Sequence, residues 1–282
     1  MMTKKLQQIY GLKWNPFAPD VPTDALLATP RIDSFTWRVE QLARDGGFAA
    51  VMGEPGTGKS VTLRLLAARL AALRDVVVGV LTRPQAGLAD FYREIGHLFG
   101  VPLSPHNRWA GSKALRDTWL AHIEAALFRP VLLIDEAQDV RTEVLNELRL
   151  LASADLDSRV ILTVILAGDR RLQERLREID LLPLDSRLRV KLLLDAASHE
   201  DLAQCLRHAL EKAGNPRLLT PGLLDALVEH AGGNHRTLMA HAHELLLAGA
   251  ERETTQLDEA LFFDLFAPAP AERPRVRAAR AR

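Results

Sequence analysis

The sequence predicts an α/β protein that contains a five-stranded parallel sheet, followed by a smaller all-helical domain. Three observations support this prediction. A glycine-rich phosphate-binding motif lies between an apolar run and a helical pattern. Short β-rich runs then alternate with longer helical patterns, and strand patterns stop after residue 197. Near-continuous apolar strands with helical crossovers are typical of a parallel sheet covered on both faces.

Composition limits the class of protein. The 282 residues suit one large domain or two modest ones, and Lys plus Arg equal Asp plus Glu at 36 each. No overall field therefore draws the chain to nucleic acid or membrane, and a DNA contact would need a local patch. Cys205 is the one cysteine, which excludes a disulfide framework, and its helix-like setting favours a small buried hydrophobe over a nucleophile. With no leader-like start and no bilayer-length apolar run, we expect a cytoplasmic protein without membrane contact.

The first 47 residues form a lead-in whose helix we expect to pack on the predicted ATPase fold. Pro16 and Pro19 interrupt regular helix, so Trp14 and Phe17 are expected to anchor the segment by packing. A helix follows near residues 34–44. The sheet domain covers residues 48–196, with strands expected at 48–52, 76–81, 130–135, 160–167 and 189–194 and helices at 60–73, 88–99, 113–128 and 142–153.

Residues 197–266 are predicted to form a helical lid domain. Ser198 begins a capping box for a helix that runs to about Ala213, and Thr220 with Pro221 starts the next helix. A third helix is expected over 235–249. Residues 267–282 are rich in Pro, Ala and Arg, and we expect this basic tail to be disordered.

Residues 53–60 match the Walker A pattern GxxxxGK[ST]. Glycines let the backbone wrap closely around a polyphosphate, and the helix N-terminus supplies positive potential. Lys59 would reach the β- and γ-phosphates of a nucleoside triphosphate, and Ser60 would ligate Mg²⁺. The strand–loop–helix context argues against a glycine turn that fits by chance. The predicted nucleotide-binding residues here are Gly53, Glu54, Pro55, Gly56, Thr57, Gly58, Lys59, Ser60 and Val61.

A second motif follows an apolar run at residues 131–134 and has the Walker B form. Asp135 is predicted to hold Mg²⁺, and Glu136 to polarise the attacking water as general base. A strand that simply ends in solvated acids is the alternative. Residues 135–138 also spell a helicase-like box, but a second motor half would need a longer chain, so we reject that interpretation.

Further residues at three places in the sequence are candidates for sensing or stabilising the γ-phosphate. Asp169, at the end of the strand at 160–167, is a sensor candidate or a turn former. Arg187, with Arg189 as second choice, is the candidate for an arginine that reaches a neighbouring subunit's nucleotide; a surface arginine is the alternative. Arg236 opens the third lid helix and either senses the γ-phosphate or is an ordinary helix N-terminal residue.

Taken in order, these motifs and the Asn15-Pro16-Phe17 segment resemble ExeA-like AAA+ ATPases, a group that includes transposition ATPases of the TniB, TnsC and MuB type. The resemblance spans about residues 12–250. It implies the AAA+ P-loop NTPase fold with a C-terminal lid, ATP rather than GTP, Mg²⁺, and assembly into a homo-oligomeric ring or filament. It also implies that Lys59, Glu136 and Arg187 serve hydrolysis and that Arg236 is the lid sensor.

The resemblance leaves two functions open, and we expect the first. One is an ATP-dependent regulator of DNA transposition that binds double-stranded DNA without sequence preference, selects the target and activates a transposase or integrase, with or without an adaptor protein. The other is an ExeA-type secretion or assembly ATPase with protein or cell-wall partners. A nucleotide-gated scaffold is a third option. Candidate DNA contacts are Arg83, Arg108 and Lys113, the last two in a loop expected at 104–113, although an ordinary solvated loop is the alternative for each.

Overall fold

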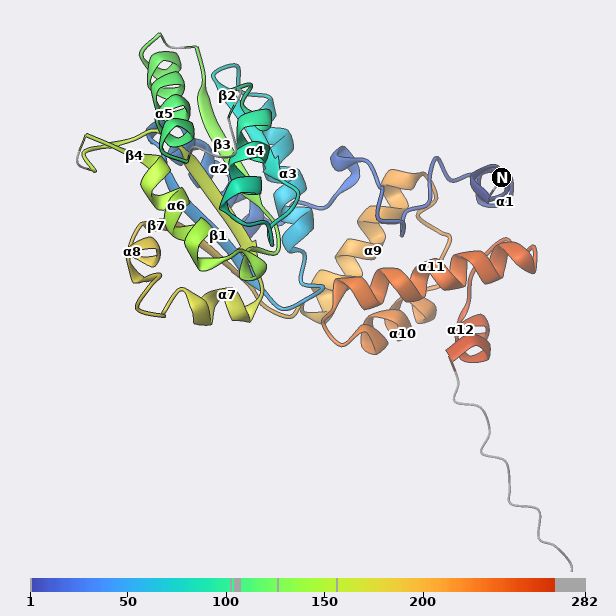
Figure 1. The fold of residues 1–282 in the computed structure, drawn as a ribbon. Coiled ribbons are helices and arrows are strands. Elements are labelled where there is room, and N and C mark those ends of the chain that lie inside the picture. The colour runs from blue at the N-terminus through green and yellow to red at the C-terminus, as the bar shows by residue number, and fades with distance from the viewer. Residues whose placement is uncertain (1, 102, 104–107, 126, 156, 267–282) are drawn as a thin grey trace, which may run out of the picture.

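The computed structural model describes residues 2–101, 103, 108–125, 127–155 and 157–266. It contains a sheet domain and a helical lid that lie side by side (Figure 1). The sheet has five parallel strands in the order β2-β3-β6-β1-β7. The predicted five-stranded parallel sheet is therefore confirmed. Its strands are β1 (Gly47–Gly53), β2 (Val76–Leu81), β3 (Arg129–Ile134), β6 (Thr163–Gly168) and β7 (Leu188–Leu194).

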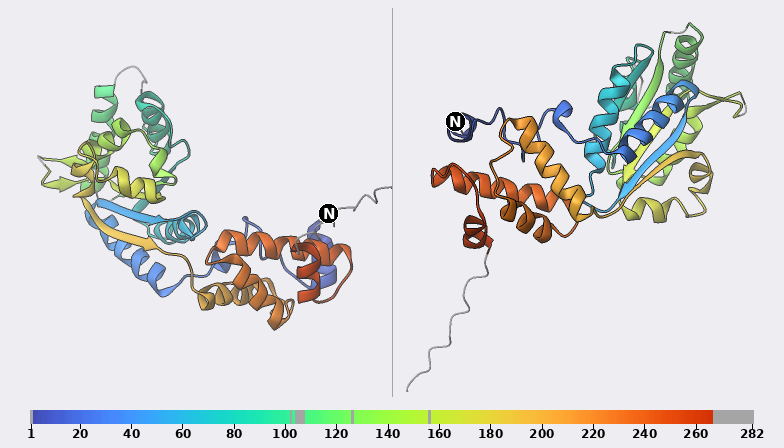
Figure 2. Two further views of the ribbon diagram at one scale, coloured as in Figure 1. Left: turned by 90° about the horizontal axis from the view of Figure 1, so that it is seen from below. Right: turned by 180° about the vertical axis from the view of Figure 1, so that it is seen from behind.

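Helices cover both faces of this sheet, as the second view in Figure 2 also shows. On one face lie α2 (Pro30–Asp45) and α3 (Lys59–Ala71), which share a core with Ala49 and Val51 of β1. The other face contacts the core that contains Phe48, Ala50 and Met52. Because side chains alternate along a strand, a strand buried on both faces must be apolar throughout. The helices of the second face are α4 (Leu88–Leu98), α5 (Arg108–Glu124), α6 (Thr142–Ala152), α7 (Arg170–Arg175) and α8 (Leu182–Asp185).

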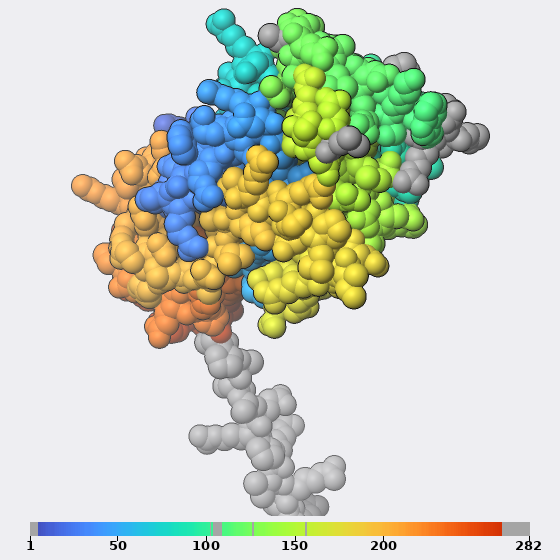
Figure 3. All heavy atoms as spheres, turned by 90° about the vertical axis from the view of Figure 1, so that its left-hand side faces the viewer, coloured from blue at the N-terminus to red at the C-terminus, as the bar shows by residue number. Residues whose placement is uncertain are grey.

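One edge of the sheet domain is formed by β7 and α2. In Figure 3 the blue surface of α2 lies next to the yellow surface that runs from α7 to β7. Val190 and Leu192 of β7 belong to the same core as α2, while Arg189 and Lys191, which alternate with them, are exposed. This alternation identifies β7 as a strand with one buried and one accessible face.

Two predicted elements differ from the structure. The strand expected over 160–167 is divided: β5 (Arg159–Val160) pairs antiparallel with β4 (Ser153–Ala154), and β6 starts at Thr163. Ile161 and Leu162 between them are fully buried, so the apolar run continues through the break and hides it from a pattern search. The helix expected over 113–128 is also displaced, because α5 starts at Arg108 and ends at Glu124.

The lid consists of helices α9 (His199–Ala213), α10 (Pro221–Ala231), α11 (His235–Glu251) and α12 (Glu259–Phe266). Its predicted caps are present. Ser198 and Asp201 form the capping box of α9, and the Thr220 side chain accepts a hydrogen bond from the backbone N–H of Leu223 at the start of α10. The sequence did not predict α12, α7 or α8.

The first part of the lead-in packs on the lid. Helix α1 (Met2–Tyr10) was not predicted, and Leu6 and Tyr10 belong to the apolar core of the lid. The expected anchor Phe17 is also buried there, with Trp14 packed against it. A short helix η1 (Thr23–Ala25) then leads to α2 on the sheet. The predicted disordered tail, residues 267–282, lies outside the described residues.

Candidate nucleotide-binding site

The glycine-rich loop connects β1 to α3 at the carboxyl edge of the sheet. Gly56 has φ +86° and Gly58, which caps α3, has φ +104°, a conformation that side-chain-bearing residues rarely adopt. A Cβ on Gly53 would lie 2.5 Å from the carbonyl oxygen of Leu194. These glycines therefore allow the tight loop that a backbone must form to wrap a polyphosphate.

Lys59 lies inside this loop. Its Nζ donates hydrogen bonds to the carbonyl oxygens of Gly53 (2.8 Å) and Glu54 (3.1 Å), and the residue is only 7% exposed. The Thr57 hydroxyl donates to the carbonyl oxygen of Glu54 at 2.8 Å and closes the loop on itself. The loop thus holds a buried ammonium group beside the N-terminus of α3, so a region of positive potential is already in place.

Ser60 and Asp135 come together although 75 residues separate them in sequence. The Ser60 hydroxyl donates to Oδ2 of Asp135 at 2.9 Å, and the backbone N–H of Glu136 donates to the other carboxylate oxygen at 2.9 Å. A hydroxyl and a carboxylate are hard oxygen ligands, which Mg²⁺ prefers alongside phosphate and water oxygens. These two residues fit the metal ion that the motifs imply.

Glu136 adopts a left-handed backbone conformation, with φ 51° and ψ 42°. Such strain in a non-glycine residue costs free energy and is enriched at functional sites. The short helix η2 (Ala137–Asp139) follows directly, and the Gln138 side-chain amide donates to Oε2 of Glu136. The sequence analysis considered Gln138 only as the last residue of the helicase-like box, so its contact with Glu136 was not predicted.

Asp169 acts as a helix cap. Its carboxylate accepts a hydrogen bond from the backbone N–H of Arg171 at 2.9 Å and pairs with the Arg171 guanidinium at 2.8 Å. The side-chain hydrogen bond from Arg171 is the main cause that holds the pKa of Asp169 below its usual value. The structure thus gives Asp169 the turn-forming role that the sequence left as the alternative to a sensor. Arg171, which also lies 3.5 Å from Asp139, is a cation at this edge that the sequence analysis missed.

Arg187 lies at the opposite edge of the sheet from its own phosphate loop. Its neighbour Leu188 pairs with Phe48 near the amino end of β1, whereas the loop follows the carboxyl end. Along the seven residues of β1 this corresponds to about 20 Å. The guanidinium donates to the carbonyl oxygen of Pro183 at 2.8 Å and pairs with Asp157. Exposed Arg189 lines the same cavity of about 240 Å³, so neither arginine reaches the chain's own loop.

The lid contacts the phosphate loop directly. The Asn234 side-chain amide donates to the carbonyl oxygen of Pro55 at 3.0 Å, and the backbone N–H of His235 donates to that of Gly56 at 3.0 Å. Asn234 also caps α11, since its side-chain oxygen accepts from the backbone N–H groups of Arg236 and Thr237. Asn234 was not among the predicted residues. Arg236 is exposed, and its guanidinium makes no hydrogen bond or ion pair with any other described residue.

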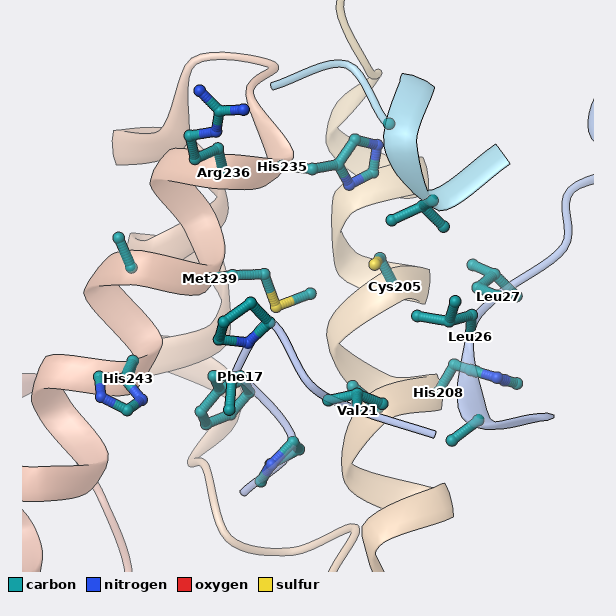
Figure 4. Close-up of a pocket in the computed structure, with 18 of the residues that line it drawn as sticks. Phe17, Val21, Leu26, Leu27, Cys205, His208, His235, Arg236, Met239 and His243 are labelled. Carbon is teal, nitrogen blue, oxygen red and sulfur yellow. The ribbon is translucent and has the colours of Figure 1, made fainter. Parts of the chain in front are cut away.

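A cavity of about 500 Å³ extends from the loop into the space between the lead-in, α9 and α11. In Figure 4 the side chains of Cys205 and Met239 point toward each other across it, and Leu26 of the lead-in lies beside them. Val61, next to the loop, lines it too. A flat heterocyclic base suits such an apolar wall with few polar groups. Burial raises the pKa of Cys205 to about 11, which agrees with its predicted role as a buried hydrophobe rather than a nucleophile.

The candidate DNA contacts lie on two different elements. Arg83 is exposed in the turn after β2. Lys113 lies within α5, with its ammonium 5.5 Å from the ring centre of Trp109, whose side chain is 74% exposed. The loop expected at 104–113 is therefore wrong from residue 108 onward, because Arg108 begins the helix. Residues 104–107 and the side chain of Arg108 lie outside the described part of the structure.

Comparison with known proteins identifies the fold. Residues 42–176 match the model of the AAA domain. General secretion pathway protein A of Aeromonas hydrophila is 31% identical over 251 residues, which cover 87% of this chain and 45% of that protein. The chain thus spans about half the length of this curated relative. In the part of the chain that the structure describes, no helix has the length and apolarity to cross a bilayer.

Solved structures agree on the architecture. Cdc6p from Pyrobaculum aerophilum superposes with a TM-score of 0.67 at 16% identity, covering 86% of this chain and 67% of that one. The ADP form of the Aeropyrum pernix ORC2 protein also gives 0.67 at 16% identity, covering 88% and 70%. Domain III of Thermotoga maritima DnaA gives 0.59 at 16% identity, covering 88% and 96%. At this identity the likeness shows the fold alone. The chain has the AAA+ P-loop fold, carries an AAA domain, and is similar over most of its length to general secretion pathway protein A.

Proposed function

We propose that this chain is a Mg²⁺-dependent ATPase that serves a secretion or assembly apparatus. The observation that carries the ATPase proposal is the 2.9 Å hydrogen bond between Ser60 and Asp135 beside the glycine-rich loop. It brings the two oxygen ligands for Mg²⁺ together and puts Glu136 next to them. The apolar cavity that continues from the loop supports adenine as the base, as the resemblance to ATP-dependent proteins implied.

Each residue of the site has a distinct part in hydrolysis. Mg²⁺, held by Ser60 and Asp135, would neutralise charge on the phosphate oxygens. Lys59 binds the β- and γ-phosphates once its ammonium turns from the loop carbonyls to the nucleotide. Glu136 accepts a proton from water as the water oxygen attacks the γ-phosphorus, and the bond from that phosphorus to the bridging oxygen breaks, which yields ADP and phosphate. Arg236, exposed at the start of α11, is available to a phosphate from the lid side.

Arg187 supports a homo-oligomeric assembly. Because it lies about 20 Å from the phosphate loop of its own chain, it can stabilise the transferred phosphoryl group only in a neighbouring copy. In that arrangement the isolated chain hydrolyses ATP slowly, and assembly stimulates hydrolysis. An arginine supplied to another subunit's site in this way contributes about 10³-fold to 10⁵-fold to turnover.

The secretion role rests on the similarity to general secretion pathway protein A. Of the two functions that the sequence left open, this similarity favours the alternative, a secretion or assembly ATPase with protein or cell-wall partners, over the expected transposition regulator. Binding to duplex DNA through Arg83, Arg108 and Lys113 stays a prediction that the same purified protein can test.

The ATPase proposal is tested with Glu136→Gln. The variant is expected to bind MgATP as tightly as the unaltered chain and to lose hydrolysis by about 10²-fold or more, because only the general base is removed. Glu143→Gln is the matched control, since Glu143 is an exposed carboxylate in the neighbouring helix α6. If Glu136→Gln hydrolyses ATP at the unaltered rate, the proposed mechanism is wrong.

The choice of partner is tested in the organism that encodes the chain. Deleting the gene is expected to reduce export of secreted proteins, and the unaltered gene but not the one encoding Glu136→Gln is expected to restore it. In parallel, binding of a fluorescent DNA duplex is measured with ATP at several salt concentrations. Normal export in the deletion strain together with tight, salt-dependent DNA binding would favour the transposition function instead.

A further inference from the structure

Gln138 is a buried polar side chain, 5% exposed, in η2 directly after the two acids of the Walker B motif. Its side-chain nitrogen donates a hydrogen bond to Oε2 of Glu136. Its side-chain oxygen accepts one from the backbone N–H of Asp169 at 3.2 Å. A single side chain therefore bridges the candidate general base at the end of β3 and the residue that follows β6.

The chemistry of the two partners fixes which way this amide faces. An ionised carboxylate can only accept a hydrogen bond, and a backbone N–H can only donate one. Rotating the Gln138 amide by half a turn would place its oxygen against Glu136 and its NH₂ group against the N–H of Asp169. Both contacts would then be repulsive around an amide that is itself buried, so one orientation is stable.

The surroundings hold the bridge in place. Arg175 of α7 donates to the backbone carbonyl oxygens of Gln138 and Val140, the latter at 2.7 Å, and to the Thr142 hydroxyl at 3.1 Å. A Cβ on Gly168 would lie 2.8 Å from the side-chain oxygen of Gln138, so glycine is needed for the close approach of β6. Backbone and side chain of Gln138 are thus both constrained.

The orientation of the Glu136 carboxylate depends on a hydrogen bond from a neighbouring side chain. A glutamate side chain loses about 1.5–2 kcal/mol of rotamer freedom when it is fixed, so an unrestrained one samples many positions. A general base must lie within hydrogen-bond reach of the water that it activates. The amide of Gln138 supplies a fixed donor on one carboxylate oxygen and leaves the other, Oε1, for that water.

We propose that Gln138 is a positioning residue that aims the Glu136 carboxylate for hydrolysis and ties its position to the carboxyl end of β6. This inference rests on the proposed function, since it assumes that Glu136 is the general base. The inference also couples β6 to the general base. A shift of β6 moves the N–H of Asp169, which moves the Gln138 amide and with it the Glu136 carboxylate. Among the described residues, the Gln138 side chain makes no hydrogen bond to Lys59 or Ser60, so we expect nucleotide binding to be separate from this effect.

The first test compares Gln138→Ala and Gln138→Glu with the unaltered chain and with Gln41→Ala, a control on α2. The Glu variant is isosteric and keeps the acceptor for Asp169 but removes the donor to Glu136, and urea unfolding of each variant checks that it folds. Both Gln138 variants are expected to lower kcat about 10-fold to 100-fold, which is no more than the loss expected when the base itself is removed in Glu136→Gln. The Kd for MgATP is expected to change less than about twofold. Unchanged kcat, or equal losses in kcat and affinity, would overturn the proposal.

The second test compares kcat with the urea-unfolding free energy of the same variants. The positioning role predicts that kcat falls under conditions in which each variant is fully folded, because the amide that orients Glu136 is gone. A loss of kcat that appears only where the variant unfolds would contradict the positioning role.

A third measurement needs no turnover and separates the two proposals. The side-chain NH₂ signals of Gln138 in the NMR spectrum, assigned by their loss in Gln138→Ala, are expected to move when Glu136 is changed to Gln. This holds even if the chain hydrolyses no ATP, in which case the proposed function fails and the bridge stands. Signals that stay in place, or that exchange with water as fast as those of exposed amides, would refute the bridge.

Discussion

The contact between the lid and the phosphate loop makes Asn234 the most informative residue to remove. In Asn234→Ala two groups of interactions disappear. The cap of α11 loses its acceptor for the N–H groups of Arg236 and Thr237, which costs about 1 kcal/mol. The hydrogen bond to the carbonyl oxygen of Pro55 is lost as well, at about 1 kcal/mol. We therefore expect the free energy of unfolding to fall by about 2 kcal/mol.

Only the second of these terms joins the lid to the loop. Because the cavity for the base lies between them, weakening the contact by about 1 kcal/mol is expected to raise the Kd for MgATP about fivefold. Affinity is measured by titration calorimetry and stability by urea unfolding.

Thr220→Ala is the matched control for this experiment. Thr220 caps α10 by accepting from the N–H of Leu223, and its hydroxyl donates to Glu259 at 2.7 Å, so it too loses a cap and one further hydrogen bond. Both partners lie within the lid. Its stability is expected to fall by a similar amount while the Kd for MgATP stays the same. Equal changes in Kd for the two variants, or none for Asn234→Ala, would refute the role assigned to the contact.

Three further predictions concern the loop and the lid. Gly56→Ala forces a side chain into a backbone with φ +86° and puts its Cβ 2.1 Å from the Asn234 side-chain oxygen. The affinity for nucleotide, measured by calorimetry, is therefore expected to fall further than in Asn234→Ala. Gly100→Ala is the control, since Gly100 also has a positive φ of +67° but open space around its Cβ, and it should leave the affinity unchanged. Ser60→Ala removes the hydroxyl beside Asp135, so the affinity for ATP with Mg²⁺ should fall toward the value in EDTA; an unchanged Mg²⁺ dependence would contradict the site. Burial lowers the pKa of His235 below its unfolded value of about 6.5, an effect that Asp201 opposes. Because the unfolded state then binds the proton first, the free energy of unfolding should decrease as pH falls through about 6.5. Measured by urea unfolding, this decrease should be smaller in His235→Asn, and an equal decrease would contradict the role of His235.

The strands and the phosphate loop could be predicted because their physical requirements are local. Residues 48–52 must be apolar to lie between two helical layers, and a loop with glycines at 56 and 58 follows from its backbone conformation. The break before Thr163 could not be predicted from the sequence, because Ile161 and Leu162, which lie before β6, are buried as fully as the residues of β6 itself. A run of apolar residues indicates that the segment is buried, but not which strand it hydrogen-bonds to.

At the site, contacts between segments distant in sequence could not be predicted. The cap at Asn234 is visible in the sequence as a helix start, but its second hydrogen bond to Pro55 spans 179 residues and depends on how the lid is placed. The same holds for Gln138 and Asp169, which meet because β3 and β6 are neighbours in the sheet. The first part of the lead-in packs on the lid for a comparable reason, since an amphipathic helix such as α1 does not specify which apolar surface it covers.

The claim that a neighbouring subunit completes the site is tested most directly by mixing two inactive variants. Glu136→Gln lacks the base but keeps Arg187, and Arg187→Ala lacks the arginine but keeps the base. When they are mixed in equal amounts at a concentration that permits assembly, about a quarter of the sites combine an intact base with an intact arginine. The account predicts that ATP hydrolysis, absent from each variant alone, returns in the mixture. A mixture no more active than the sum of its parts, or full activity of Arg187→Ala alone, would contradict it.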